Sequence, residues 1–200
     1  MVEDNVKMLK ELKKHAKNEK IPIMQDSGLN YLTSFIDNKS IKTVLEIGSA
    51  IGYSSIVMAL SNQNVIITTI ERDEERYLEA VKNIKKFNLE NRITIIYKDA
   101  LDLKLDEKYD LIFIDAAKGQ NKKFFEKFML NLNKDGYIIT DNINFHGYTK
   151  MNETDIKSKN LRQLVRKIKE YIIFLKENKD YDTEFLNIGD GISITHRKSD

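Results

Sequence analysis

Oxygen-bearing side chains follow two apolar runs of the chain, at the point where each run ends. Asp115 comes directly after residues 109–114, and Asp141 with Asn142 comes directly after residues 136–140. If both runs are parallel strands, their carboxyl ends meet at the edge of the sheet where ligands bind. Two carboxylates and an amide oxygen, without cysteine, suit a hard cation such as Mg²⁺ and disfavour zinc. We therefore predict a Mg²⁺ site at Asp115, Asp141 and Asn142, the alternative being helix caps or loop carboxylates.

Two further residues lie near this predicted site in the sequence. Lys118, three residues after Asp115, is a candidate general base if the neighbouring cation favours its neutral amine form. The alternative for Lys118 is an ordinary surface charge. His146 lies in the polar loop after Asn142, where a lone histidine is more often solvated or at the edge of a substrate than a ligand. We leave His146 out of the metal site.

A second constellation lies upstream, where a strand passes through a glycine turn into a helix. Gly48 and Gly52 are separated by three residues, so the Gly-x-Gly-x-x-Gly dinucleotide fingerprint is not met. Glu71 ends the next apolar run, where an acidic group can accept hydrogen bonds from both ribose hydroxyls. Asp99-Ala100 follows the third run, where an adenine would lie. Together these segments predict a nucleoside site; taken singly, they are a structural turn and solvated charges.

Alternating short β-branched runs and amphipathic stretches must position these residues. The predicted strands cover residues 43–47, 65–70, 93–97, 109–114 and 136–140, and the predicted helices cover residues 53–60, 74–87 and 121–130. Two helices, over residues 4–19 and 25–36, come first, and a helix from 158 to about 178 precedes a hairpin of 183–188 with 191–196. This order predicts an α/β fold, a three-layer sandwich with a mostly parallel, seven-stranded sheet and an antiparallel C-terminal hairpin.

The length and composition of the chain exclude several classes of protein. The chain has 200 residues without a Gly-, Pro- or Ser-rich linker, so we expect one domain over residues 1–200. A hydrophobic content of 41% excludes a disordered chain, and a net charge of +2 excludes a polycation that coats nucleic acid. No apolar run reaches roughly 18 residues and no signal peptide is evident, so we expect a cytoplasmic protein with no membrane contact.

Four segments resemble those of the metal-dependent O-methyltransferases of the catechol and caffeoyl-CoA type. The segments are Leu-Glu-Ile-Gly-Ser-Ala-Ile-Gly-Tyr-Ser at 45–54, Ile-Glu-Arg at 70–72, Phe-Ile-Asp-Ala-Ala-Lys-Gly-Gln at 113–120 and Thr-Asp-Asn at 140–142. The resemblance covers about residues 5–197. Within the family, the chain is most similar to the bacterial tRNA 5-hydroxyuridine methyltransferases, which also resemble it at Pro-Ile-Met 22–24 and Gly-Asp-Gly 189–191.

The resemblance implies a class I methyltransferase fold, a bound S-adenosylmethionine and a Mg²⁺ at the three ligands named above. The implied cofactor contacts are Met24, Glu46, Gly48, Ser54, Glu71, Asp99, Ala100 and Asp115. Lys118 matches the Asp-x-x-Lys base of the catechol enzymes, which makes Lys118 and Asp115 the implied catalytic residues. Met24 alone would be interpreted as a core methionine. The helices within residues 1–40 would cover the cofactor.

The same resemblance favours tRNA as the acceptor, with methylation of a wobble 5-hydroxyuridine to 5-methoxyuridine. A single-stranded anticodon loop can present such a base to a pocket. A small catechol-like acceptor and a nucleotide-binding module without catalysis are the alternatives. Basic stripes on two predicted helices permit RNA binding, although such stripes are usually solvated faces; they are Lys7, Lys10, Lys14 and Lys17, and Lys159, Arg162, Arg166 and Lys169. The likeness also implies a homodimer, and we expect no DNA partner.

Overall fold

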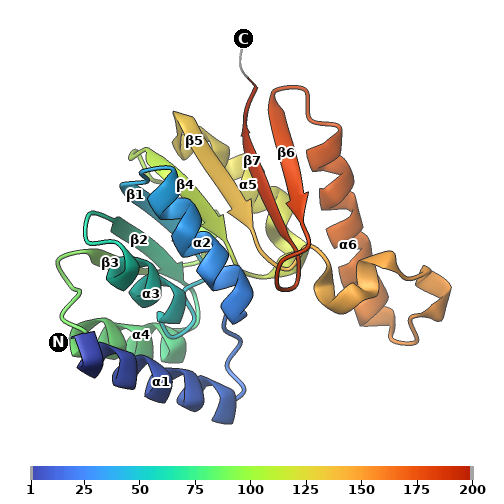
Figure 1. Ribbon diagram of the computed structural model, residues 1–200. Helices are drawn as coiled ribbons and strands as arrows, with labels where there is room; N and C mark the ends of the chain where they lie inside the picture. The colour runs from blue at the N-terminus through green and yellow to red at the C-terminus, as the bar shows by residue number, and fades with distance from the viewer. Residues whose placement is uncertain (1, 199–200) are drawn as a thin grey trace.

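The computed structural model describes residues 2–198, and its seven strands form one sheet in the order β3-β2-β1-β4-β5-β7-β6 (Figure 1). The strands are β1 (Thr43–Ile47), β2 (Ile66–Glu71), β3 (Ile93–Tyr97), β4 (Tyr109–Ile114), β5 (Leu132–Thr140), β6 (Tyr181–Leu186) and β7 (Ile192–Arg197). The first five strands run parallel, and β7 is antiparallel to both β5 and β6. The predicted α/β sheet with an antiparallel C-terminal hairpin is therefore confirmed.

Helices cover both faces of this sheet. They are α1 (Val2–Asn18), α2 (Asp26–Asn38), α3 (Tyr53–Ser61), α4 (Glu74–Lys86), α5 (Asn121–Phe128) and α6 (Lys159–Lys176). Helices α1–α4 contribute to one buried apolar cluster, and α5 and α6 contribute to a second one. In Figure 1, α2 lies in front of the sheet and α5 lies behind it. The layers are thus helix, sheet and helix, as predicted.

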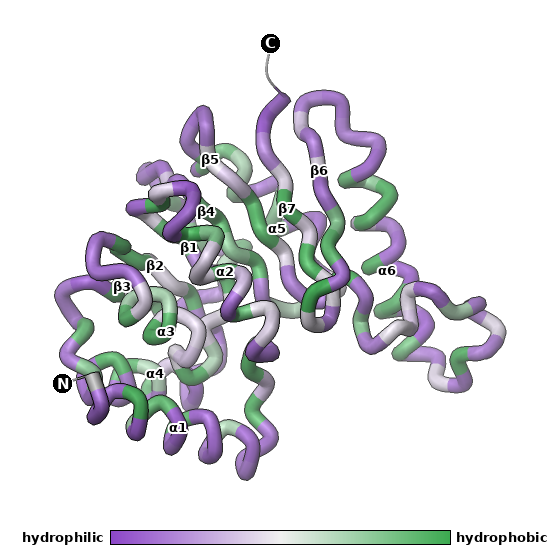
Figure 2. Tube along the Cα trace, viewed as in Figure 1, coloured by the Kyte–Doolittle hydropathy of each residue, from purple (hydrophilic) through white to green (hydrophobic). Residues whose placement is uncertain are grey.

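The central strand β4 is buried on both sides, which explains why its sequence is almost entirely apolar. In β4, Leu111 and Phe113 face the α1–α4 cluster, whereas Ile112 and Ile114 face the α5–α6 cluster. Figure 2 shows this as a hydrophobic centre flanked by helices whose outer faces are hydrophilic. Because successive side chains alternate between faces, a strand needs apolar residues at every position to fill both cores.

Strand β5 departs most from its predicted bounds. The prediction begins the fifth strand at residue 136, but β5 begins at Leu132, which pairs with Tyr109 before the register shifts. Gly136 lies at this irregularity, and a Cβ there would be 3.0 Å from the backbone oxygen of Asp110. The polar residues 133–135 do not show the apolar pattern of a strand. This part of β5 could not be predicted from the sequence, because it forms through pairing with β4.

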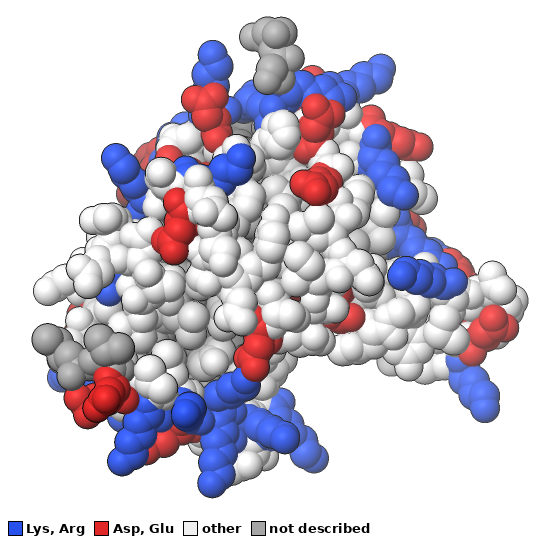
Figure 3. All heavy atoms as spheres, viewed as in Figure 1, with Lys and Arg blue, Asp and Glu red and all other residues white. Residues whose placement is uncertain are grey.

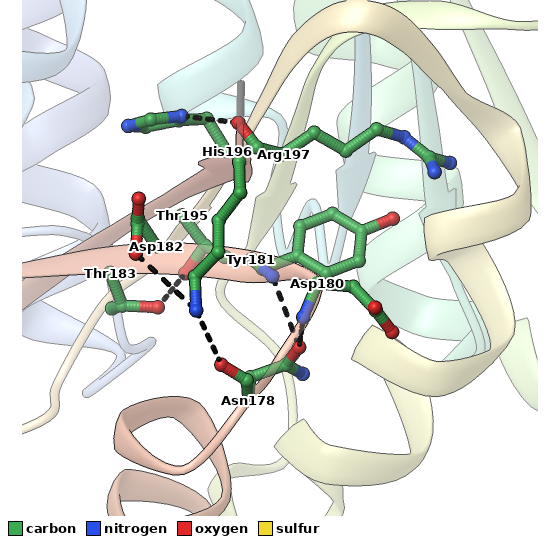
Figure 4. A network of polar contacts seen from close by, with 9 residues as sticks. Asn178, Asp180, Tyr181, Asp182, Thr183, Thr195, His196 and Arg197 are labelled. Atoms are coloured by element: carbon green, nitrogen blue, oxygen red, sulfur yellow. Dashed lines mark hydrogen bonds and ion pairs between the residues drawn. The ribbon is translucent and has the colours of Figure 1, made fainter. Parts of the chain in front are cut away.

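The far end of the hairpin is closed by polar contacts (Figure 4). The side-chain oxygen of Asn178 accepts hydrogen bonds from the backbone N–H groups of Asp180 and Tyr181, at 3.0 and 3.1 Å. Thr183 and Thr195 share a hydrogen bond of 2.9 Å across β6 and β7. These contacts fix the register of the hairpin, so its other end reaches the carboxyl edge of the parallel strands. Within the described part of the chain, none of the helices has both the length and the apolar character of a membrane span.

Candidate active site

A cavity of about 510 Å³ lies at the carboxyl ends of the parallel strands. Its walls come from the turns after β1, β2, β3, β4 and β5, and from residues 22–25 between α1 and α2. Ten of the eleven sequence-predicted site residues line it: Met24, Gly48, Ser54, Glu71, Asp99, Ala100, Asp115, Lys118, Asp141 and Asn142. The structure therefore brings the predicted nucleoside and metal residues to one cavity.

The glycine turn after β1 brings two strand ends close together. Gly48 has a φ of +97°, and a Cβ there would lie 2.7 Å from the backbone oxygen of Asp115. A side chain at this position would therefore separate the β1 turn from the end of β4. Gly52, with a φ of +80°, begins α3 in a left-handed conformation that suits glycine. These two positions explain the spacing of the glycines without a dinucleotide fingerprint.

Glu71 fastens this turn to the end of β2. Its Oε2 accepts a hydrogen bond of 2.8 Å from the N–H of Ala50, and its Oε1 accepts bonds of 2.9 Å from Arg72 and Asp73. A carboxylate has about four acceptor positions, so lone pairs remain for a ligand in the cavity. Glu71 thus holds the turn and still presents an acidic edge at the place predicted for ribose.

Glu46 is not part of the cavity wall, where a direct contact with the cofactor would place it. It is fully buried, does not line the cavity, and accepts hydrogen bonds from the hydroxyls of Ser54, Ser55 and Thr69. Burial raises the pKa of Glu46, and these three hydrogen bonds oppose the shift. The strand alternation turns Glu46 into the protein, where it orients Ser54, which does line the cavity.

Asp99 caps the short turn that follows β3. The N–H of Leu101 donates a hydrogen bond of 2.9 Å to Asp99, and Arg72 lies 3.1 Å from the other carboxylate oxygen. The hydrogen bond from Leu101 and the charge of Arg72 lower the pKa of Asp99. Ala100 follows in the same wall, and the buried Met24 lies in the segment from α1 to α2.

Asp115 and Asp141 end neighbouring strands, as the sequence predicts. Their N–H groups continue the sheet by donating to Ile47 and Ile114, each at 3.1 Å. Burial raises the pKa of Asp115 well above its usual range, and the charge of Asp141 raises it further. Burial likewise raises the pKa of Asp141 to about 6. The positive charge of Lys118 lowers the pKa of both carboxyl groups and so opposes the effect of burial. Lys118 therefore lies near two carboxylates whose charged forms burial disfavours.

This donor set fits a hard divalent cation. Asn142 adopts a left-handed φ of +63°, and its amide nitrogen lies 3.1 Å from Asp141. The side chain of Asn142 therefore lies beside the carboxylates, where rotation of the amide would present its oxygen to a cation. Among residues 2–198, no group of three or more His, Cys, Asp or Glu side chains is placed to hold a metal. The predicted set has only two carboxylates, so Mg²⁺ at this position stays a prediction.

The loop over residues 144–157 borders the same end of the cavity. It carries His146, for which the sequence suggests a solvated or substrate-edge position, and it contacts Asp190, which the predicted site does not include. His146 and Asp190 line the cavity next to Asp141 and Asn142. Asp190 comes from the Gly-Asp-Gly turn between β6 and β7. That motif could have indicated the site. Because β7 runs antiparallel to β5, the turn that precedes β7 must lie at the ligand-binding edge of the sheet. Gln120 and Phe124 also line the cavity.

The basic stripe of α6 contributes to this loop. Arg162 donates a hydrogen bond of 3.0 Å to the backbone oxygen of Ile156, and Lys169 donates one of 2.8 Å to that of Met151. Arg166 forms an ion pair of 2.7 Å with Glu153. Three of the four basic residues in this stripe therefore bind the loop, which gives them a structural role.

Comparisons with known proteins point to one family. The sequence profile of a family described as O-methyltransferase matches residues 1–198. The caffeoyl-CoA O-methyltransferase of Stellaria longipes is 30% identical over 203 residues, which cover 94% of this chain and 83% of that protein.

Solved structures agree on the fold. A candidate caffeoyl-CoA O-methyltransferase from Staphylococcus aureus is 38% identical, with a TM-score of 0.90, over 95% of this chain and 92% of that one. An O-methyltransferase from Bacillus cereus in complex with SAH, 23% identical, has a TM-score of 0.81 over 96% of this chain and 91% of that one. These likenesses confirm the predicted class I methyltransferase fold. With a profile that matches nearly every residue, this chain belongs to the O-methyltransferase family.

Proposed function

We propose that this protein transfers a methyl group from S-adenosylmethionine to a ring hydroxyl that has a second oxygen beside it, in a reaction that requires Mg²⁺. One observation carries the proposal: a single cavity joins the ribose-type acid Glu71 to the carboxylates Asp115 and Asp141. The similar Bacillus cereus structure holds SAH, the product of this cofactor. The proposal therefore assigns the Glu71 end to the cofactor and the Asp141 end to the acceptor.

The cofactor and the metal supply complementary chemistry when bound. S-adenosylmethionine offers a methyl group on a cationic sulfonium, and Mg²⁺ lowers the pKa of a hydroxyl that it contacts and orients that hydroxyl.

The residues of the chain supply position and proton transfer. Glu71 and the turn at Gly48 bind and orient the nucleoside, and residues 22–25 close the cavity, so that the N-terminal helices cover the cofactor. Asp115, Asp141 and Asn142 hold the cation. Lys118 accepts the proton of the acceptor hydroxyl at Nζ. The deprotonated oxygen then takes the methyl group as the carbon–sulfur bond breaks, which leaves S-adenosylhomocysteine.

A small catechol-like molecule is the first choice of acceptor. The relative from Stellaria longipes is named for caffeoyl-CoA, whose caffeoyl ring carries two adjacent hydroxyls. A tRNA 5-hydroxyuridine, which the sequence resemblance favours, also has adjacent ring oxygens and is the second candidate. The observation in its favour is the stripe of Lys7, Lys10, Lys14 and Lys17, which are exposed on α1. Figure 3 shows Lys and Arg side chains gathered along this edge of the molecule.

A methyl-transfer assay tests the proposal. Labelled S-adenosylmethionine and Mg²⁺ are offered with a simple catechol, with tRNA that carries 5-hydroxyuridine, and with the same tRNA carrying plain uridine, each with and without EDTA. We expect transfer to the catechol that EDTA abolishes. Transfer only to the hydroxylated tRNA would move the acceptor to RNA, and EDTA-resistant transfer would overturn the metal assignment.

A further inference from the structure

The loop beside the carboxylate pair has an unusual backbone. Phe145, His146 and Gly147 have φ values of +41°, +53° and +80°, so three consecutive residues are left-handed. Non-glycine residues seldom adopt this conformation, and it persists where surrounding contacts hold it, often at functional sites. Something outside the loop must therefore hold Phe145 and His146 in place.

The turn between β6 and β7 supplies that hold. Oδ1 of Asp190 accepts a hydrogen bond of 2.5 Å from the N–H of His146, and the backbone oxygen of Asp190 accepts one of 2.8 Å from Asn144. Asn144 also donates from its side chain to Asn187, at 2.7 Å. The loop and the hairpin turn thus form one unit, although they are separated by more than 40 residues.

Only one of the two carboxylate oxygens of Asp190 accepts a hydrogen bond from the loop. The residue is 6% exposed, and its Oδ2 is buried without a hydrogen-bond partner in the described structure. Nδ1 of His146 lies 3.5 Å from this oxygen. The His146 side chain is 66% exposed and lines the cavity. A small rotation of this exposed ring would bring Nδ1 into hydrogen-bonding distance of the unsatisfied oxygen.

We propose that Asp190 and His146 form an acceptor-binding pair, in which Asp190 keeps the imidazole proton on Nδ1 and leaves Nε2 to accept a hydrogen bond from the substrate. A carboxylate facing one ring nitrogen fixes the proton there, so the other nitrogen of the neutral ring is an acceptor. The substrate donor is an N–H or O–H on the ring, such as the second hydroxyl of a catechol or the ring N–H of a uracil. This inference rests on the proposed function. His146 touches the substrate, and Asp190 is a positioning residue.

The tautomer of His146 can be measured directly by long-range ¹H–¹⁵N NMR at about pH 9, where free imidazole is neutral. The chain has only three histidines. His196 is an internal reference, because its Nδ1 lies 2.8 Å from the backbone oxygen of Arg197, which can only accept (Figure 4). We expect the proton of His146 on Nδ1 in the wild type and on Nε2 in Asp190→Asn, whose amide can still accept from the backbone of His146. A proton on Nε2 in the wild type would overturn the proposal.

Kinetics with three variants test the contact with the substrate. His146→Asn keeps a group near Nδ1, suits a left-handed φ and loses Nε2, whereas His146→Gln places an amide near the position of Nε2. For whichever of the catechol and the hydroxylated tRNA is methylated, we expect His146→Asn and Asp190→Asn to raise the acceptor KM about tenfold, the loss of one hydrogen bond. His146→Gln should restore most of the loss. An unchanged KM in His146→Asn would contradict the proposal.

Binding of S-adenosylhomocysteine separates this test from that of the proposed function. By calorimetry, its Kd should stay within twofold of the wild-type value in all three variants, because the pair lies at the acceptor end. A parallel loss of cofactor affinity and acceptor affinity would assign Asp190 a merely structural role and overturn the proposal. If neither acceptor is methylated, the proposed function fails, whereas the NMR result still decides the tautomer.

Discussion

Carboxylates at the strand ends divide into two groups by their hydrogen-bond donors. Glu46 and Glu71 each accept three hydrogen bonds from protein hydroxyl or backbone donors, which fixes their orientation. Asp141 receives only the short-range contact from Asn142, and Asp115 has no hydrogen-bond donor to its side chain among the described residues. The hydrogen bonds therefore fix the first pair, of which only Glu71 also lines the cavity, whereas the side chains of Asp115 and Asp141 keep more free acceptor positions in the cavity wall.

Removal of Asp141 separates metal binding from cofactor binding. In Asp141→Ala we expect methyl transfer to fall at least about a hundredfold, because one of the two charged ligands proposed for Mg²⁺ is lost. The affinity for S-adenosylhomocysteine, measured by calorimetry, should change less than twofold. Asp102→Ala, an exposed acid at the same edge of the sheet, is the matched control and should retain full activity. Equal loss of transfer and of cofactor binding would show that Asp141 has a structural role.

We expect Glu46 to influence cofactor binding through its hydrogen bond with Ser54, and its amide variant tests this. In Glu46→Gln, one of the three hydroxyls must turn from donor to acceptor, so we expect about 1–2 kcal/mol loss of stability in urea unfolding. The affinity for S-adenosylhomocysteine should fall severalfold, because Ser54 is in the cavity wall. Ser55→Ala removes a hydroxyl that does not line the cavity and should keep that affinity. If both variants bind the ligand as the wild type does, Glu46 does not orient the site.

At the scale of the elements, one carboxylate joins three strands near their amino-terminal ends, opposite the cavity. Asp110, in β4, accepts hydrogen bonds of 3.0 Å from the N–H groups of Lys42 and Thr43 and one of 2.7 Å from Asn133 in β5. Burial alone would raise the pKa of Asp110, but these hydrogen bonds lower it overall. The contacts fasten β1 and β5 to β4, so they set the strand ends that carry the site about five residues further on.

The pKa of Asp110 makes part of the stability depend on pH. A carboxyl whose pKa is lower in the folded state contributes stability above its unfolded pKa of about 3.9, and the contribution is lost as the pH falls through the folded value. We expect Asp110→Asn to lower the free energy of unfolding by about 1–2 kcal/mol at pH 7, with the difference shrinking below about pH 4. Asp135→Asn, an exposed neighbour, is the control for urea unfolding at each pH. A difference that does not change with pH would contradict this assignment.

The elements that could be predicted are those whose signal is local. Strands β1, β3 and β4 begin and end as predicted because β-branched runs are bounded there by polar turns. The start of β5 could not be predicted, since Asn133 joins the strand through its bond to Asp110. The Gly-Asp-Gly motif indicates that Asp190 lies at the ligand-binding edge, but its contact with His146 could not be predicted, because it links distant segments and no periodic pattern indicates such a contact.

For the whole molecule, the arrangement of charge bears on the choice of acceptor. The net charge is only +2, and three cations of the α6 stripe bind the neighbouring loop. The lysines of α1 are the remaining stripe. A phosphate-bearing acceptor would release counterions from each phosphate that these lysines contact, so its binding would depend steeply on salt.

Salt dependence therefore distinguishes the two acceptors. We expect kcat/KM for a catechol to change less than twofold between about 50 and 200 mM salt, because an uncharged acceptor releases no counterions. The combined change of Lys7, Lys10, Lys14 and Lys17 to Ala should leave it equally unaffected. The outcome against this expectation is a steep salt dependence with hydroxylated tRNA that the quadruple variant flattens, which would identify the α1 surface as an RNA contact.

The way in which the loop over residues 144–157 is held has a consequence for how such a protein can diversify. Its beginning is fastened to the β6–β7 turn through Asp190, and its later part is fastened to α6 through Arg166 and Lys169. Neither fastening involves the strand ends that form the nucleoside half of the cavity. Under the proposed function, the segment between these two attachments could therefore change in sequence between relatives that use different acceptors, while the half of the cavity assigned to the cofactor stays the same.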